Sequence, residues 1–290
     1  MMSKTGLILE GGGMRGMYTA GILDVFMEHG IRFDGVIGVS AGAIHACSYL
    51  SEQKGRDFRY YKKYCTDPRF VSFKSLIKTG DIVGADFCYH QIPDVLDPYD
   101  HDAFLKNKTE FYVTCTNLHT GMAEYPRVTD MREQIDLVRA SASLPYVSRI
   151  VRIDGKKYLD GGCTDSIPVD AFRKMGFEKT VLILTRPDGY ERKKEHSILA
   201  RLRYWRYPKF VKALLSRHDR YNATKKEIAE LGRAGKVFVI CPKEELNIGR
   251  LESDPAQIQR VYDIGYEDGE KILGELTVWL SNTGKQEEKS

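Results

Sequence analysis

The stretch VIGVSAGAIHACSYL, residues 36–50, joins a short apolar run directly to residues with helical spacing. An earlier run, GLIL at residues 6–9, leads into GGGMRG at residues 11–16 and then into a helical pattern that ends at His29-Gly30. This order of strand, helix, strand and helix predicts an α/β fold in which helices cover a mostly parallel sheet. Further strands are predicted at residues 110–116, 180–185 and 236–240, and a final helix at about 255–281.

The composition is that of an ordinary globular protein, with 290 residues, 42% of them hydrophobic and 29% charged. We expect a single domain over residues 1–281, followed by a polar tail at 282–290. The six cysteines show no disulfide or metal-ligand spacing, so we expect reduced thiols and no metal site. No signal peptide or membrane-spanning pattern is present in the sequence, which predicts a cytoplasmic protein with the option of peripheral contact at the inner membrane face.

The sequence GVSAG, residues 38–42, has the form G-x-S-x-G at a predicted strand-to-helix junction. Such a turn exposes the serine hydroxyl, and the glycines let the strand and the helix cross closely. Ser40 is therefore a candidate nucleophile, with Gly38 and Gly42 as supporting residues. The alternative is a helix-capping serine between two packing glycines.

The glycine-rich sequence GGGMRG also follows a strand and begins a helix. Consecutive glycines allow backbone N–H groups to converge on a developing oxyanion, which makes Gly11, Gly12 and Gly13 candidates for that role. Arg15 and Gly16 would support the loop. The same residues also satisfy G-x-G-x-x-G, and Asp34 lies near the position at which a dinucleotide site has an acidic residue.

Asp160 ends the sequence IVRIDGKKYLD at residues 150–160, in which two alternating runs flank Asp154-Gly155. That dipeptide predicts a β-hairpin. A carboxylate held at the end of its second strand can act as the base for a serine, and Gly161 and Gly162 would leave space around it. The alternative is an Asx turn.

Together, GGGMRG, GVSAG and DGG resemble the motifs of the patatin-like phospholipases, here of the bacterial single-domain type. The stretch ASASLPYVSRIVRIDGKKYLDGG, residues 140–162, is also similar, and the resemblance covers about the first 190 residues. It implies a three-layer α/β/α fold and a Ser-Asp dyad that needs no metal or cofactor. By this resemblance Ser40 is the nucleophile, Asp160 is the base, and the amides of Gly11 to Gly13 form the oxyanion hole.

We therefore expect a serine acyl hydrolase that cleaves the carboxylic esters of lipids, with a phospholipid or lysophospholipid as substrate. Two alternatives are a nucleotide-binding oxidoreductase that uses the glycine loop and a non-catalytic member that binds lipid or a partner. A conventional Ser-Asp-His triad would need His196 or His218, whose basic surroundings favour surface positions. His45 is expected to pack on the helix after Ser40.

Residues 186–226 form a basic segment with thirteen Lys or Arg against four Asp or Glu. Within it, LARLRYWRYPKFVKALL interleaves apolar and basic residues, a pattern of helices that contact anionic membranes. We interpret this basic helical segment as a lid or a membrane-facing part. The alternative is a helix with a buried stripe and a solvated basic face. No nucleic-acid-binding module accompanies the charge, so no nucleic-acid partner is expected. The sequence leaves the oligomeric state open.

Overall fold

The computed structural model describes residues 4–194 and 198–282. Its centre is a nine-stranded sheet in which the order β6-β7-β3-β2-β1-β8-β9 forms the main path, and β4 and β5 pair with β3. The strands are β1 (Thr5–Leu9), β2 (Gly35–Val39), β3 (Glu110–Asn117), β4 (Met122–Glu124), β5 (Arg127–Val128), β6 (Val151–Ile153), β7 (Lys156–Asp160), β8 (Lys179–Ile183) and β9 (Val237–Ile240).

The five strands predicted from apolar runs, β1, β2, β3, β8 and β9, are mutually parallel. The predicted hairpin is also present, because β6 and β7 pair antiparallel across Asp154 (φ 48°) and Gly155 (φ 74°). β3 is long enough to pair with β2 along its first half and with β7 along its second half. The predicted α/β class is confirmed.

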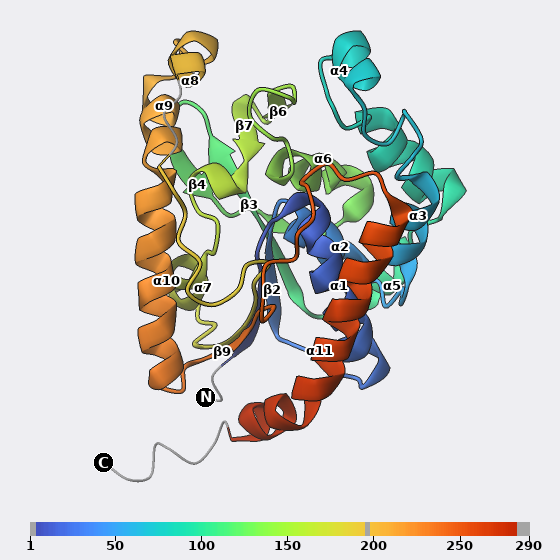
Figure 1. The fold of residues 1–290 in the computed structure, drawn as a ribbon, viewed down its shortest axis with the longest axis vertical. Helices are drawn as coiled ribbons and strands as arrows, with labels where there is room; N and C mark the ends of the chain where they lie inside the picture. Colours follow the sequence, from blue (N-terminus) through green and yellow to red (C-terminus); the bar gives the residue numbers. More distant parts are fainter. Residues whose placement is uncertain (1–3, 195–197, 283–290) are drawn as a thin grey trace.

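Helices lie on both faces of the sheet (Figure 1), as the parallel connections require. The helices are α1 (Gly16–Glu28), α2 (Ala41–Leu50), α3 (Arg56–Tyr64), α4 (Phe73–Thr79), α5 (His101–Lys106), α6 (Met131–Ser141), α7 (Val169–Lys174), α8 (Ile198–Arg203), α9 (Pro208–Leu215), α10 (Arg217–Arg233) and α11 (Pro255–Ser281), with short 3-10 helices η1 (Gly13–Arg15) and η3 (Gly161–Cys163) and a π-helical segment, η2 (Phe87–Leu96). The predicted last helix matches α11.

The central strands separate two apolar cores. Along β1, Leu7 and Leu9 belong to the core that includes α1, α2 and α11, whereas Ile8 belongs to the core with α7 and α10. This assignment follows from the two-residue period of a strand, because neighbouring side chains point to opposite faces. Both faces are therefore apolar, which explains why these strands read as continuous hydrophobic runs.

A third, smaller core lies beneath the basic segment. Tyr204, Phe210 and Val211, from the α8–α9 region, pack against Leu118 and Leu159 of the sheet region. One side of the segment is thus buried, as its alternative interpretation required, while much of α8 remains exposed. No helix in the described ranges 4–194 and 198–282 is both long enough and apolar enough to cross a bilayer. The predicted polar tail, apart from Asn282, lies outside the described residues.

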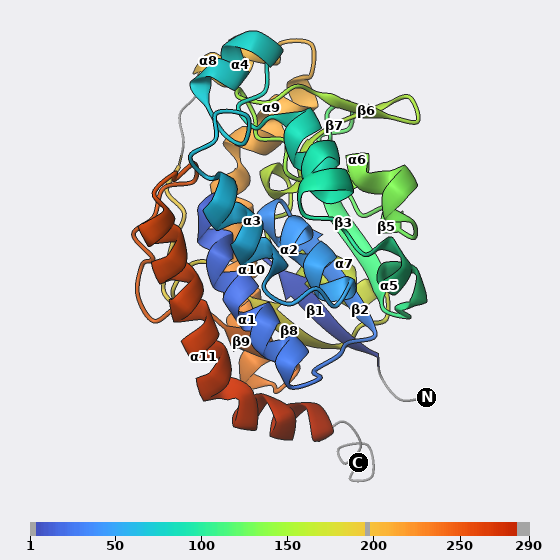
Figure 2. The same cartoon turned by 90° about the vertical axis from the view of Figure 1, so that its right-hand side faces the viewer.

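Helices α1 and α11 cross at very short range, and Figure 2 shows α11 running alongside α1. A β-carbon on Gly265 of α11 would lie 2.0 Å from the carbonyl oxygen of Tyr18, and one on Gly21 of α1 would lie 2.4 Å from the carbonyl oxygen of Tyr262. The two backbones therefore touch through their glycines. Gly274, on the same helix α11, has no atom within 4 Å of that position.

This crossing gives a stability prediction. Gly265→Ala should destabilise the fold by about 1–3 kcal/mol, because the added methyl group forces the two helices apart. Gly274→Ala should instead stabilise it by about 0.5–1 kcal/mol, because alanine favours a helix and meets no neighbour there. Urea unfolding followed by circular dichroism measures both, and equal effects of the two variants would contradict the close crossing.

Candidate active site

Ser40 occupies the sharp turn between β2 and α2. Its backbone has φ 55° and ψ −122°, outside the regions that an L-residue ordinarily adopts, and its side chain is largely buried. The Ser40 N–H donates a 2.9 Å hydrogen bond to Ser141 Oγ at the end of α6. The turn is thus anchored from a second element, and it holds the serine at the start of α2, where the helix favours negative charge.

The two glycines of GVSAG allow this turn to pack. A β-carbon on Gly38 would lie 2.4 Å from Ala43 Cα, and one on Gly42 would lie 2.3 Å from the carbonyl oxygen of Leu9. Both positions therefore require glycine for close backbone packing. Gly11 approaches the turn from β1, and its β-carbon would lie 2.8 Å from Ser40 Cβ. The glycine loop consequently packs directly against Ser40.

Asp160 is the last residue of β7 and is almost completely buried. Its N–H donates to the carbonyl oxygen of Ser143 (2.8 Å), and its Oδ1 accepts from the Gly162 N–H (2.8 Å). Oδ2 accepts no hydrogen bond of ordinary geometry from any residue in the described ranges. One carboxylate oxygen therefore fixes the side chain, and the other is available to a hydroxyl group.

Burial raises the pKa of the Asp160 carboxyl above its usual range, because the charged form is poorly solvated there. The positive charge of Arg217 and the nearby Ser40 hydroxyl both oppose this rise. The Ser40 side chain thus lies close enough to Asp160 to affect its protonation. A carboxylate whose pKa is raised is also a stronger proton acceptor than an ordinary aspartate.

The loop after β1 presents unused amides beside Ser40. The N–H groups of Gly11, Gly12 and Gly13 donate to no acceptor among the residues that the structure describes. Gly13 has φ 58°, and its loop is held by a 3.2 Å hydrogen bond from the Met14 N–H to the carbonyl oxygen of Arg250. Backbone amides without a protein acceptor are the kind of donor that an oxyanion hole uses.

The supporting residues also lie around the turn. Arg15 is buried beside the glycine loop, and Gly16 accommodates His45, whose Nε2 would lie 2.6 Å from a β-carbon at that position. A β-carbon on Gly161 would lie 2.0 Å from the carbonyl oxygen of Thr114. One on Gly162 would lie 2.9 Å from an Arg217 nitrogen. The structure therefore brings the predicted site residues together at one end of the sheet.

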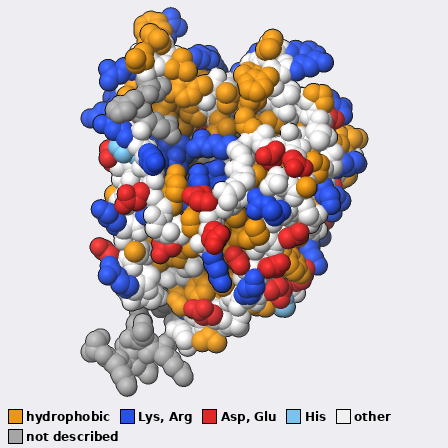
Figure 3. Space-filling view, viewed as in Figure 1, with side chains coloured by type: hydrophobic (Ala, Val, Ile, Leu, Met, Phe, Trp, Pro, Cys, Tyr) orange, Lys and Arg blue, Asp and Glu red, His pale blue; other side chains and the backbone are white. Residues whose placement is uncertain are grey.

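Ser40 and Asp160 both line a cavity of about 340 Å³. Much of its wall is apolar and comes from α3, the residues around α4 and η2, and the loop after α6, including Tyr60, Phe70, Val83, Tyr89, Leu144 and Val147. In Figure 3, hydrophobic side chains surround a hollow on the upper part of the face shown, with basic side chains deeper within it. A volume of this order suits a small ligand or part of a lipid chain.

No histidine of the described chain lines this cavity. His218 lies next to a separate surface hollow and contacts Asp219, whereas His196 lies outside the described residues. His45 is fully buried, and its Nδ1 lies 3.0 Å from Asp57 Oδ2. His45 is thus an interior residue of α2, as expected.

The dinucleotide interpretation of the glycine loop fails on the position of Asp34. This residue immediately precedes β2, and its carboxylate accepts hydrogen bonds from the Thr5 N–H and hydroxyl at the start of β1. The glycine loop follows the opposite, carboxyl end of β1. The loop and Asp34 therefore lie at opposite ends of the parallel strands, so a ribose held near the loop would be far from the Asp34 carboxylate.

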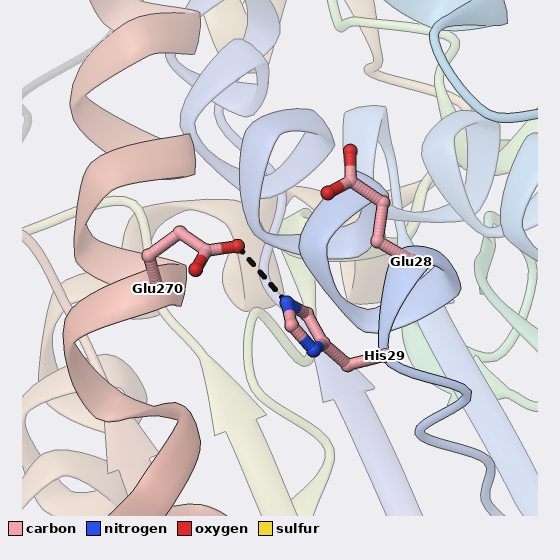
Figure 4. Close-up of side chains that lie close together, drawn as sticks. All are labelled: Glu28, His29 and Glu270. Carbon is pink, nitrogen blue, oxygen red and sulfur yellow. Dashed lines mark hydrogen bonds and ion pairs between the residues drawn. The ribbon is translucent and has the colours of Figure 1, made fainter.

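One group of potential metal ligands lies on the surface, away from the cavity lining. Glu28, His29 and Glu270 approach one another where α1 meets α11, and Figure 4 shows His29 directed toward Glu270. Glu28 already forms an ion pair with Lys54 and accepts a 2.8 Å hydrogen bond from the Tyr266 hydroxyl. These contacts tie the two helices together, and we interpret the group as structural.

The model of the patatin-like phospholipase family matches residues 7–173 of the chain. The chain belongs to this family. A second model, of a domain of unknown function, matches residues 207–281. The patatin-like match contains Ser40, Asp160 and the glycine loop, and the second match contains α9, α10 and α11.

Two curated relatives illustrate the range of similar proteins. The uncharacterised Escherichia coli (strain K12) protein YjjU is 29% identical over 187 residues, which are 63% of this chain and 52% of that protein. An Aspergillus niger lysophospholipase, nte1, is 28% identical over 178 residues, 60% of this chain and 11% of the fungal protein. The match thus spans about half of YjjU and a small part of the fungal enzyme. Legionella pneumophila VipD has a TM-score of 0.46 and 14% identity, over 94% of this chain and 67% of VipD.

Three arginines lining the cavity were not predicted from the sequence. Arg192 comes from the chain after β8, Arg217 begins α10, and Arg250 precedes α11. Ser141, which anchors the Ser40 backbone, lies in the family-like stretch 140–162, and no role was predicted for it from the sequence. A local pattern could not distinguish Arg192 and Arg217 from the other basic residues of 186–226, and Arg250 lies outside that segment. The position of all three at the cavity depends on how α10 and α11 pack.

The buried carboxyl gives a prediction on stability and pH. A raised pKa means that the fold loses stability as the pH rises through the folded-state pKa of Asp160. Asp160→Asn should therefore raise Tm at pH 7, and the gain should disappear below about pH 3.8, where the unfolded carboxyl is also protonated. Thermal unfolding over a pH series measures this difference.

Asp67 is a matched control, because its pKa is shifted in the opposite direction from that of Asp160. The ion pair with Arg69 lowers the pKa of Asp67, so Asp67→Asn should not raise Tm at pH 7. An unchanged or lower Tm for Asp160→Asn at pH 7 would mean that the carboxyl is well solvated or fully compensated.

Proposed function

We propose that the protein is a serine acyl hydrolase that cleaves carboxylic esters of lipids through a Ser40–Asp160 dyad. The observation that carries the proposal is the site's geometry. Ser40 has a strained backbone and lies beside a buried carboxylate and three unused amides, at the wall of a largely apolar cavity. Membership of the patatin-like family and similarity to proteins named lysophospholipases support a lipid ester as the substrate.

In the proposed reaction, Ser40 Oγ attacks the ester carbonyl carbon as Asp160 takes the hydroxyl proton. The amides of Gly11, Gly12 and Gly13 donate to the oxyanion of the tetrahedral intermediate. When the intermediate collapses, the C–O bond to the alcohol breaks and Asp160 returns the proton to the departing oxygen. Asp160 then takes a proton from water as the water oxygen attacks the carbonyl carbon of the acyl-enzyme. When the C–O bond to Ser40 breaks, Asp160 returns that proton to Ser40 Oγ and the fatty acid leaves.

The first test replaces the nucleophile. Ser40→Ala should lower the hydrolysis of a p-nitrophenyl ester by at least about 1000-fold, because no covalent intermediate can form. It should also abolish labelling by a fluorophosphonate at Ser40, which peptide mass spectrometry detects. Circular dichroism verifies that the variant is folded.

His218→Ala separates the dyad from a histidine triad. Under the dyad its turnover should stay within about tenfold of the wild type, a barrier change of about 1.4 kcal/mol or less. A folded Ser40→Ala variant with nearly full activity would remove Ser40 as nucleophile. A folded His218→Ala variant as inactive as Ser40→Ala would replace the dyad with a triad.

We also propose that the mouth of the cavity docks on an anionic phospholipid bilayer. Helices α4 and α8 lie at the same end of the molecule in both ribbon views (Figures 1 and 2). They expose large apolar side chains, here called the docking rim: Phe73 and Ile77 from α4, and Ile198, Leu199, Leu202 and the following Trp205 from α8. Ile77 is 88% exposed and Trp205 is 68% exposed, so neither has a place in the core.

Basic residues accompany both parts of the docking rim. Lys74 and Lys78 are exposed on α4, and Arg201, Arg203 and Arg206 are exposed on or just after α8. None of these five forms an ion pair with a residue in the described ranges, which leaves their charges for an external anion. In Figure 3, apolar projections stand on both sides of the hollow on the upper part of the face shown. Apolar side chains beside free cations suit an anionic lipid surface.

The docking proposal predicts a charge-dependent loss of binding. Arg201→Gln, Arg203→Gln and Arg206→Gln together should weaken binding to phosphatidylglycerol vesicles by at least tenfold, since each cation near such a surface contributes about 1 kcal/mol. Added salt should also weaken vesicle binding, because it screens the charges. Co-sedimentation at low and high salt measures this, beside hydrolysis of a soluble ester, which should change little.

A charge-matched control lies on and just after α10. Lys226, Arg233 and Lys236 are also exposed, and their combined replacement by Gln should leave vesicle binding nearly unchanged. Equal losses in the two triple variants would indicate a non-specific effect of net charge. Equal sedimentation of the wild type with neutral and anionic vesicles would exclude the proposed role of the basic residues.

A further inference from the structure

Four arginine side chains line the Ser40 cavity, and we call them the arginine cluster: Arg15, Arg192, Arg217 and Arg250. They come from four separate places in the chain, namely the glycine loop, the segment after β8, the start of α10 and the loop before α11. Basic side chains are visible within the hollow in Figure 3. Arg217 and Arg250 belong to the region matched by the domain of unknown function.

Much of the hydrogen-bonding capacity of the arginine cluster is unused within the described residues. Arg15 is 7% exposed, yet it makes no hydrogen bond or ion pair with any residue that the structure describes. The Nε atoms of Arg192 and Arg217 are likewise buried without an acceptor in those residues. Arg217 makes one long contact, 3.4 Å to Ser166 Oγ, and Arg192 stacks on Tyr221 at 4.7 Å. Polar groups of this kind are normally paired when they are buried.

The carboxylates of the cavity do not neutralise the cluster. Glu10 and Asp160 are the acidic residues in its described lining. The Glu10 oxygens accept from the Tyr221 hydroxyl (2.9 Å) and the Thr185 N–H (2.7 Å), so they fix the ends of β8 and α10 rather than bind a guanidinium directly. Arg186, which also lies nearby, is already paired with Glu245. Four cations therefore face two carboxylates.

This excess charge has an electrostatic cost. Burial, together with Arg186 and Arg250, lowers the pKa of Arg15 to about 10. Burial and the positive charge of Arg217 also lower the pKa of Arg192. An anion that contacts several of these groups would relieve their mutual repulsion and supply the missing acceptors.

We propose that the arginine cluster binds the phosphate group of an acyl ester substrate, while the apolar wall of the same cavity receives its acyl chain. This inference rests on the proposed lipid hydrolase function. A phosphate presents several acceptor oxygens in a tetrahedral arrangement and up to two negative charges, which suits guanidinium groups that approach from different elements. In a phosphate-bearing glyceride, the phosphate is separated from the acyl ester by a few bonds.

The apolar and basic parts of the lining come from different regions of the sequence. Residues from α3 to η2 and after α6 supply most of the apolar wall, and three of the four arginines come after residue 190. The chain after residue 190, which includes the region of unknown function, would thus supply specificity for the phosphate-bearing part of the substrate.

Arg217 has a second effect, because it is the strongest charge that opposes the raised pKa of Asp160. The test therefore uses Arg192 and Arg250.

The experiment measures binding without turnover. Octyl phosphate, which contains no carboxylic ester, is titrated into the full-length Ser40→Ala protein by isothermal calorimetry, beside octanol and inorganic phosphate. In that background, Arg192→Gln with Arg250→Gln should weaken octyl phosphate binding at least tenfold, about 1.4 kcal/mol. Arg152→Gln with Arg233→Gln removes two exposed arginines that do not line the cavity and should change Kd by less than twofold.

A kinetic measurement on the protein with Ser40 intact complements the calorimetry. The value of kcat/KM for 1-decanoyl-glycerol 3-phosphate should exceed that for 1-decanoylglycerol by at least tenfold, and Arg192→Gln with Arg250→Gln should remove this preference. Arg250→Gln alone provides a variant at an exposed position, in case loss of the half-buried Arg192 impairs folding.

The outcomes distinguish this inference from the proposed function. Hydrolysis of both esters at equal rates, with no octyl phosphate binding, would overturn the phosphate subsite and leave the hydrolase intact. Binding of octyl phosphate that depends on Arg192 and Arg250, without hydrolysis of either ester, would support the subsite and contradict the hydrolase. Inorganic phosphate binding as tightly as octyl phosphate would indicate a site for free phosphate and overturn the lipid assignment.

Discussion

The backbone of Ser40 is held at φ 55° by packing on three sides, and the rest of the site depends on this constraint. The glycines at 38 and 42 let β2 and α2 meet without intervening side chains, and Gly11 brings the loop after β1 against the same turn. Ser141 holds the Ser40 N–H from α6. A strained conformation persists only where its surroundings determine it from several directions. Here those surroundings also bring the unused amides of the glycine loop beside the serine.

The site concentrates groups that are unfavourable for folding. Asp160 is a carboxyl whose pKa is raised by burial, and Arg15 is a buried guanidinium without an acceptor among the described residues. Such groups lower the stability of a fold, and they are tolerated when activity needs them. The extensive apolar cores on both faces of the sheet supply the stability that offsets this cost. The close glycine-mediated contact of α1 and α11 belongs to that framework.

The proposed functions concern one cavity and the surface formed by α4 and α8. Ser40, Asp160, the apolar wall and the arginine cluster line the same cavity, and the docking rim lies on α4 and α8 at one end of the molecule. Such an arrangement suits an amphipathic ester whose acyl chain lies against apolar side chains. Arg192 and Arg217 of the arginine cluster lie near the cations of α8 in the sequence, yet the two groups have different roles in these proposals. The cations on and just after α8 are exposed, whereas Arg15 of the cluster is buried and Arg192 and Arg217 are half-buried.

Much of this protein could be predicted from local sequence. The parallel strands are continuous apolar runs because both of their faces are buried, and Asp154-Gly155 specifies the β6–β7 hairpin through its positive φ angles. Ser40 and the glycine loop were identifiable because their chemistry lies in consecutive residues at strand ends. The pairing of Ser40 with Asp160 came from a family resemblance. The tertiary structure alone decided which of thirteen basic residues in 186–226 enter the cavity and which face solvent, and that Arg250 joins them. A side chain's exposure depends on how distant helices pack, and no local spacing encodes that arrangement.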